Sequence, residues 1–142
     1  MPTGMPRPLP DHDTKPFWEA CVEGRLIVPR CRRCGHLRWP PGPMCPACQS
    51  TATEWVACSG RGSVYSWVVA THPVDAVLAD QVPYVIAMID LPEGARIVGN
   101  VEGCRPQDVT AGMEVELLFS EPGEDGIAIP SFRARDQATT ER

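Results

Sequence analysis

Two Cys-x-x-Cys pairs constrain the fold of this chain more than any other feature of its sequence. The first pair is Cys31 and Cys34, the second is Cys45 and Cys48, and residues 35–44 separate them. Each short pair places two sulfurs on one side of a tight turn, and the spacer is long enough for the two turns to face each other across a tetrahedral ion. The spacing therefore predicts a zinc ribbon in which these four cysteines bind Zn²⁺.

A zinc ion held by four thiolates has no open coordination position for water or substrate. We therefore expect a structural zinc ion that organises the ribbon and takes no part in chemistry. His36, beside the first pair, is an alternative ligand, although four cysteines already complete a tetrahedral set. Four free thiols or two disulfides are the other alternative, and disulfides need an oxidising compartment.

The sequence gives no sign of secretion or of a membrane-spanning helix. Residues 1–10 contain proline and arginine but lack the apolar segment of a signal peptide, and no apolar run reaches 18 residues. We therefore expect a cytoplasmic protein, in which the seven cysteines stay reduced.

Charge is divided unevenly along the chain. Residues 25–50 contain five arginines and no carboxylate, whereas residues 59–136 contain five arginines and twelve carboxylates. The ribbon is therefore the positive pole, even after the charge of four thiolates on a divalent ion is counted. Because arginine binds phosphate through two parallel hydrogen bonds, Arg32, Arg33 and Arg38 are candidate phosphate ligands. The alternative is that these arginines only balance the thiolates and solvate the ribbon.

The segment before the ribbon predicts one short helix. Asp13 or Thr14 is suited to cap it, Pro16 fits its first turn, and Gly24 ends it. Strands are expected at residues 26–28 and 37–39, on either side of the first cysteine pair. The prolines within residues 40–43 end the second of these strands, because proline lacks the N–H that a strand ladder needs.

The remainder of the chain predicts a β domain. Sixteen prolines and twelve glycines favour short strands and turns over long helices. A connecting strand at residues 53–57 precedes five strands, with one helical turn at residues 106–111 between the third and the fourth. This order is that of an OB-fold barrel, and the expected fold class is mainly β. The five strands are expected at residues 63–70, 84–91, 95–101, 113–119 and 127–135.

The domain organisation follows from these elements. We expect a helix and zinc ribbon over residues 13–52 and an OB-fold domain over residues 53–136. Flexible tails are expected at residues 1–12 and 137–142, because both ends are polar and lack an apolar pattern.

Four aromatic residues lie in the smaller, ribbon half of the chain. Their number exceeds what a ribbon of this size readily buries, and such a surplus suggests an interface with another protein. They are Phe17, Trp18, Trp39 and Trp55.

Besides the four motif cysteines, three cysteines could act as nucleophiles and three histidines as bases, but none belongs to a recognisable local signature. Lone cysteines of this kind are more often small buried hydrophobic residues, so we expect structural roles for them. These residues are Cys21, Cys58, Cys104, His12, His36 and His72.

Several motifs in one order, spanning about residues 14–135, add a resemblance to these observations. They are Pro16-Phe17-Trp18-Glu19, residues 25–48, Gly60-Arg61-Gly62-Ser63-Val64-Tyr65-Ser66, Pro83-Tyr84-Val85, Gly99-Asn100-Val101 and Gly112-Met113-Glu114-Val115. Together they resemble the acyl-CoA-associated family with a rubredoxin-like zinc ribbon and an OB-fold. Members of this family are small partners of thiolase-fold enzymes, including thiolases, acyltransferases and the aldolases that shorten steroid side chains.

The resemblance implies a non-catalytic accessory subunit that stabilises its enzyme partner and shapes the acyl-CoA site. It implies that the partner carries out carbon–carbon bond cleavage or formation and that acyl-CoA lies at or near the interface. Steroid side-chain degradation is a candidate pathway, because partners of this kind occur there. Arg32, Arg33 and Arg38 are then expected to contact the phosphates of coenzyme A. Because thiolase-fold enzymes are usually dimers, we expect a heterotetramer with two copies of each chain.

Two other function classes stay open. Zinc ribbons and OB barrels also bind single-stranded nucleic acid, and Tyr65 and Trp67, which alternate onto one face, are able to stack on bases. The excess of carboxylates in the barrel opposes this class, because a groove that follows a phosphate backbone should be basic. The third class is a carrier or enzyme that works without a partner, and the surplus of aromatic residues opposes it.

Overall fold

The strands form two separate sheets in the computed structural model, which describes residues 5–135. In the ribbon half, β1 (Leu26–Cys31) pairs antiparallel with β2 (Thr53–Cys58). The other five strands close into a barrel in the order β3-β4-β5-β7-β6. Their bounds are Arg61–Ala70 for β3, Tyr84–Asp90 for β4, Arg96–Glu102 for β5, Glu114–Phe119 for β6 and Pro130–Ala134 for β7.

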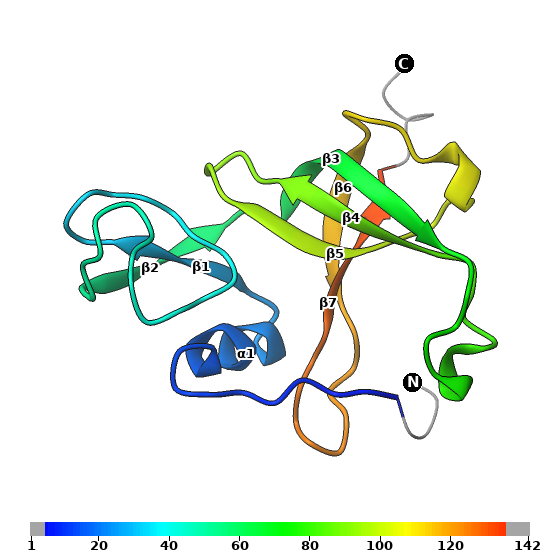
Figure 1. Cartoon of the computed structure of the whole chain (residues 1–142), viewed down its shortest axis with the longest axis horizontal. Helices are drawn as coiled ribbons and strands as arrows, with labels where there is room; N and C mark the ends of the chain where they lie inside the picture. Colours follow the sequence, from blue (N-terminus) through cyan, green and yellow to red (C-terminus); the bar gives the residue numbers. More distant parts are fainter. Residues whose placement is uncertain (1–4, 136–142) are drawn as a thin grey trace.

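These elements confirm the predicted fold class. One helix, α1 (Lys15–Val22), precedes the ribbon, and the five predicted barrel strands are present in the predicted order. The helical turn expected after the third of them is a 3-10 turn, η2 (Pro106–Asp108). In Figure 1 the ribbon and the barrel form two ends of the molecule, with α1 beneath the ribbon sheet. No helix within residues 5–135 is long and apolar enough to cross a membrane.

One apolar core runs from α1 and β1 into the barrel. Phe17 of α1 and Val28 of β1 belong to the same buried cluster as Ile89 of β4 and Phe132 of β7. Burial of apolar surface is the main term that stabilises a fold of this size. The ribbon is therefore packed against the barrel and does not hang from it as a separate unit.

The aromatic residues of the ribbon half contribute to this core, so the chain itself covers part of the aromatic surplus that was predicted to form an interface. Phe17 is only 3% exposed. Its ring centroid lies 5.0 Å from that of Trp18 and 6.3 Å from that of Trp39, both edge to face. The two tryptophans and Trp55 are half-buried and pack against the core. The core shared by α1, β1 and the barrel therefore covers part of each indole ring, which the ribbon sequence alone does not show.

The β4–β5 hairpin meets the ribbon at two points. Glu93 in the hairpin turn accepts a hydrogen bond of 2.9 Å from the N–H of Ser59, which follows β2. The next residue, Gly94, has a φ of +112°. A Cβ built on it would lie 3.3 Å from Leu37 of the ribbon. Glycine is favoured here both by the backbone conformation and by the close approach.

A bulge in β3 separates two aromatic residues that alternation would place together. The register against β4 shifts between Val64 and Ser66, so Tyr65 is the extra residue. Tyr65 is 52% exposed. The guanidinium carbon of Arg96 lies 3.5 Å from its ring centroid. Trp67 packs against the core. The prediction that these two rings share one face is therefore wrong.

Two details of the ribbon half also differ from the predictions. No side-chain hydrogen bond from Thr14 caps α1. Instead, Asp11 accepts hydrogen bonds of 2.9 Å from the N–H groups of Asp13 and Thr14. The strand predicted at residues 37–39 is reduced to a single bridge between Leu37 and Arg30. The prolines that follow cannot donate to a ladder, and pairing stops there.

The N-terminal segment is tied to the barrel by an ion pair within the described residues. Arg7 donates two hydrogen bonds of 2.9 Å to Asp125 and one of 2.8 Å to the carbonyl of Ile127. The guanidinium of Arg7, followed by the N–H of Ile127, lowers the pKa of Asp125 from 3.8 to about 2. Residues 1–4 and 137–142, where tails were predicted, lie outside the described part of the chain.

We expect Asp125→Asn to remove a pH-dependent contribution to stability. The folded-state pKa of Asp125 lies below its ordinary value, so the contribution is complete above about pH 4 and is lost as the pH falls towards 2. Thermal unfolding of the wild type and Asp125→Asn should differ at pH 5 and converge by pH 2. Glu124→Gln, at the neighbouring exposed position, is the control. Equal midpoints for wild type and Asp125→Asn at pH 5 would contradict the assignment.

Candidate metal centre

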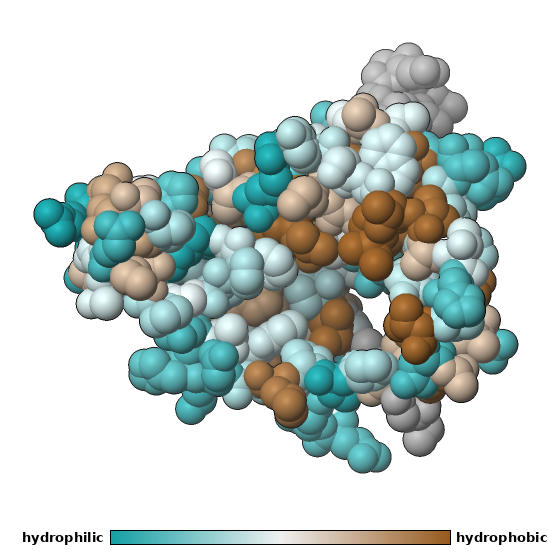
Figure 2. Space-filling view, in the orientation of Figure 1, coloured by the Kyte–Doolittle hydropathy of each residue, from teal (hydrophilic) through white to brown (hydrophobic). Residues whose placement is uncertain are grey.

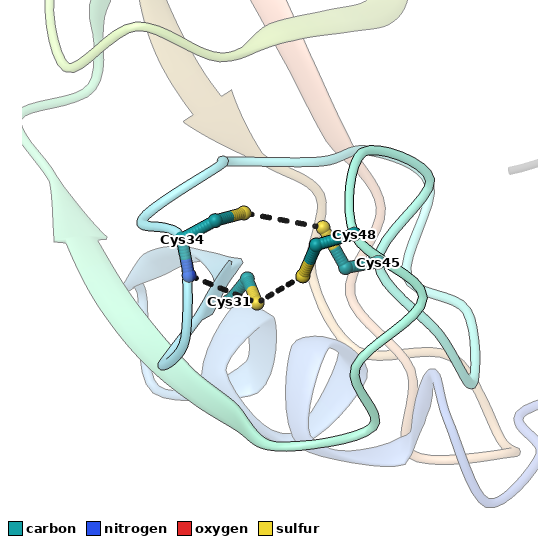
Figure 3. A group of neighbouring side chains, drawn as sticks. All are labelled: Cys31, Cys34, Cys45 and Cys48. Atoms are coloured by element: carbon teal, nitrogen blue, oxygen red, sulfur yellow. Dashed lines mark hydrogen bonds between the residues drawn. The ribbon is translucent and has the colours of Figure 1, made fainter.

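The four cysteines of the two predicted pairs converge on one point. Their sulfur atoms all lie within 4.8 Å of one another. The distance is 3.5 Å between the sulfurs of Cys31 and Cys48 and 3.6 Å between those of Cys34 and Cys45. Figure 3 shows the four side chains pointing inward from two facing turns. A zinc–sulfur distance of about 2.3 Å in a tetrahedron requires sulfurs about 3.8 Å apart. The donor set and its spacing therefore fit a tetrahedral ion.

Two turns of similar backbone position these cysteines. In the first, the N–H of Gly35 donates to the carbonyl of Cys31 at 2.9 Å, and in the second the N–H of Gln49 donates to that of Cys45 at 2.8 Å. The residue that follows each pair has a positive φ, +79° for Gly35 and +63° for Gln49. Sequence reasoning missed both residues. The available signal is their equal offset of four positions from the first cysteine of each pair.

Backbone hydrogen bonds prepare the site for a cation. The N–H of Cys34 lies 3.5 Å from the sulfur of Cys31 and donates to it. This contact is the main cause that lowers the pKa of Cys31 to about 6. A thiolate is the form that binds metal, so a lowered pKa favours metal binding at neutral pH. His36 contributes its carbonyl, which accepts from the N–H of Cys31, while its exposed ring lies outside the four-sulfur group.

The ribbon arginines divide into different environments. Arg25 forms an ion pair with Glu23 at 3.3 Å, and Arg30 forms one with Glu54 at 3.0 Å. Both carboxylates lie just outside the acid-free segment of the sequence. Arg32 and Arg33 are exposed. Arg32 donates one hydrogen bond of 3.3 Å to the carbonyl of Thr53. The free positive charge of the ribbon is therefore concentrated beside the first cysteine pair.

Arg38 is buried, unlike the other ribbon arginines. It is 8% exposed, and its Nη2 atom donates to the carbonyl of Gly42 at 3.0 Å and to the hydroxyl of Thr53 at 2.8 Å. Its Nε and Nη1 atoms are buried without an acceptor among the described residues. These hydrogen bonds tie the proline-rich loop between the cysteine pairs to the start of β2.

The other three cysteines lie outside the metal centre. Burial raises the pKa of Cys21 to about 12. Burial, followed by the charge of Glu93, raises that of Cys58 to about 12. Burial and then Asp108 raise the pKa of Cys104. A raised pKa keeps each thiol protonated at neutral pH. Within residues 5–135, no hydrogen bond joins any of them to a histidine that could act as a base.

Comparison with protein families gives matches to both parts of the chain. The model described as "ChsH2, rubredoxin-like zinc ribbon domain" matches residues 18–54, and the one described as "ChsH2, C-terminal OB-fold domain" matches residues 55–120. The chain belongs to this family. The family match and the four converging sulfurs together identify a zinc-ribbon centre formed by Cys31, Cys34, Cys45 and Cys48.

Relatives with related names support the family assignment. A DUF35 domain-containing scaffold protein of Methanocaldococcus jannaschii is 43% identical over 76% of this chain and 79% of its own length. Benzoylsuccinyl-CoA thiolase subunit BbsA of Thauera aromatica is 34% identical over 82% of each chain. A probable enoyl-CoA hydratase alpha subunit of Thermomonospora curvata is 41% identical over 90% of this chain, which spans only 39% of that relative's length.

A solved structure also resembles the whole module. It is a chain of the Ltp2-ChsH2(DUF35) aldolase, 40% identical, with a TM-score of 0.78. The match covers 90% of the present chain and 98% of the aldolase chain. The ribbon and the barrel therefore occur together in a relative of almost the same extent.

We expect the purified chain to contain one zinc ion per molecule and to lack visible absorbance. Removal of the ion by a chelator should unfold the ribbon, because structural zinc supplies on the order of 10 kcal/mol in small ribbons. The tryptophan emission should then shift to the red, since Trp39 and Trp55 lose their packing. Cys34→Ser should lose the metal, and Cys104→Ser is the control that keeps it. A red protein with visible absorption bands would contradict zinc and indicate iron.

Proposed function

We propose that this chain is a non-catalytic accessory subunit of a thiolase-fold enzyme that forms or cleaves carbon–carbon bonds in acyl-CoA substrates. Relatives named as a thiolase subunit, a scaffold protein and a component of an aldolase support this proposal. A steroid side chain is the acyl group suggested by the family resemblance. The complex is expected to be a heterotetramer with two copies of each chain.

The observation that carries the proposal is the closed ligand set of the metal centre. Four converging cysteine sulfurs are enough to fill the tetrahedral ligand set of a zinc ion, which would leave no position for substrate or water. The three remaining thiols are held in the protonated, unreactive form by burial. A chain with these properties contributes structure and binding surface, while its partner supplies the nucleophile and the base.

The exposed arginines of the ribbon supply a phosphate-binding surface. Of the three arginines predicted to contact the phosphates of coenzyme A, Arg32 and Arg33 present exposed side chains. Arg38 is engaged with Gly42 and Thr53. We therefore assign the phosphate contacts to Arg32 and Arg33. We assign Arg38 a structural role, in which it holds the proline-rich loop between the two cysteine pairs against the start of β2.

Affinity purification of the tagged chain from its own organism, followed by mass spectrometry, tests the accessory role. We expect recovery of a thiolase-fold protein in equal molar amount. The isolated complex should turn over an acyl-CoA substrate, and the chain alone should not. A chain that stays monomeric in the same extract and acts on acyl-CoA without a partner would contradict the proposal.

Substitution of the exposed arginines tests the phosphate contacts. Arg32→Ala and Arg33→Ala should each weaken binding of acyl-CoA to the purified complex about tenfold or more, because a hydrogen bond to a charged group contributes about 1.5–3 kcal/mol. Titration calorimetry measures the effect. Arg25→Ala is the matched control, because Arg25 lies in the same half and is already paired with Glu23. Unchanged affinity in both variants would limit Arg32 and Arg33 to solvation of the ribbon.

A further inference from the structure

The outer surface of strands β3, β4 and β5 is exposed and has an uncharged centre. Strand pairing places two neighbouring rows of outward residues across these strands. Val68 is 62% exposed, Met88 41% and Val98 42%. Figure 2 shows brown, hydrophobic surface over these strands. We call this surface the barrel face. Its two central rows are Val68, Ile86 and Asn100, and Ser66, Met88 and Val98.

The loop of residues 71–83 extends the barrel face beyond the end of β3. It contains the short turn η1 (Ala76–Leu78) and Val74, which is 84% exposed. Figure 2 shows a further hydrophobic patch over this loop on the same side of the molecule. The exposed valine therefore adds a second apolar patch on the side of the molecule that carries the apolar strands.

Charged residues lie at the two ends of the barrel face. At one end, Arg96 is paired with Asp90 at 2.6 Å and covers the ring of Tyr65. At the other end are three exposed carboxylates without an ion pair among the described residues. A centre depleted in charge, with methionine and tyrosine present and a charged rim, is the composition of a protein interface. The three carboxylates belong to Asp75, Asp80 and Glu102.

From these observations we infer that the barrel face is the docking surface for the thiolase-fold subunit, an inference that rests on the proposed function. The matching surface of the partner is apolar at its centre and carries arginine or lysine opposite Asp75, Asp80 and Glu102. The aldolase relative supports a site on this module, because the match covers 98% of a chain from an aldolase that is named for both Ltp2 and ChsH2.

A second copy of this chain fits the barrel face less well. Arg96 is the one arginine on the rows that join β3, β4 and β5, and it is already held by Asp90 and Tyr65. The exposed Arg61 lies outside these rows, where β3 pairs with β6. The three carboxylates would therefore meet no free arginine or lysine within the same rows of an identical face. The face and loop 71–83 together supply about the twenty to thirty residues that one side of a standard interface uses. A different protein that carries basic residues opposite the three carboxylates would contact both the apolar centre and the acidic end of the barrel face.

Aspartate substitutions at the centre of the face test the inference in the intact complex. Val68→Asp and Met88→Asp each introduce a carboxylate at a position that the bound partner would shield from water. Each should weaken the complex about thirtyfold or more, as at central interface positions. The probe is the thiolase-fold subunit that copurifies with the wild-type chain, and binding is measured by surface plasmon resonance. Met44→Asp is the matched control, because Met44 is 49% exposed but lies on the ribbon.

The outcomes separate this inference from the proposed function. If the wild-type chain recovers no thiolase-fold subunit, the proposed function fails. If it does, but Val68→Asp and Met88→Asp bind as tightly as wild type, the barrel face is not the docking surface. Loss of binding with Met44→Asp alone would move the interface to the ribbon. A wild-type homodimer that Met88→Asp splits would assign the face to a second copy. Unchanged zinc content and near-ultraviolet circular dichroism establish that the variants are folded.

Discussion

The convergence of four cysteine sulfurs is the constraint on which the rest of this molecule depends. The ribbon has a two-stranded sheet and long connecting turns, which bury too little apolar surface to hold the turns in place. A tetrahedral ion replaces that missing core with four short bonds between two backbone turns. The same geometry that stabilises the ribbon also closes the ion to ligands. The four thiolates therefore both stabilise the ribbon and leave the ion without an open coordination position.

The ribbon is held in one position relative to the barrel. Phe17 and Val28 belong to a core that both parts share, and the N–H of Ser59 donates a hydrogen bond to Glu93 in the barrel. Gly94 lets the hairpin approach Leu37 closely enough for the two halves to pack. The position of each exposed residue on the ribbon is therefore set relative to the barrel, although the two parts have separate hydrogen-bonded sheets.

Sequence reasoning succeeded where a local pattern determines the structure. The cysteine spacing predicted the metal centre, and the strand pattern predicted the barrel, because ligand spacing and alternation are local properties. It failed where a distant part of the chain decides the environment. Nothing next to Arg38 indicates that Thr53 will accept its hydrogen bond, and nothing next to Trp39 indicates that its ring will pack against Phe17 of α1. The bulge at Tyr65 is a property of strand pairing, and alternation within one strand cannot reveal it.

The ribbon exposes fewer aromatic and arginine side chains than its sequence predicts, and this difference bears on function. The ribbon was predicted to form an interface because these residues are concentrated there. Folding withdraws much of that surface: Phe17 enters the core, the tryptophans become half-buried, Arg38 is buried, and Arg25 and Arg30 are paired. What stays accessible is a small basic surface at Arg32 and Arg33 and a larger apolar one on the barrel. A small charged surface suits a small anionic ligand, whereas a broad uncharged one suits a protein. Because one core joins the two, a partner bound to the barrel would find the basic surface at a fixed distance, held there by the metal.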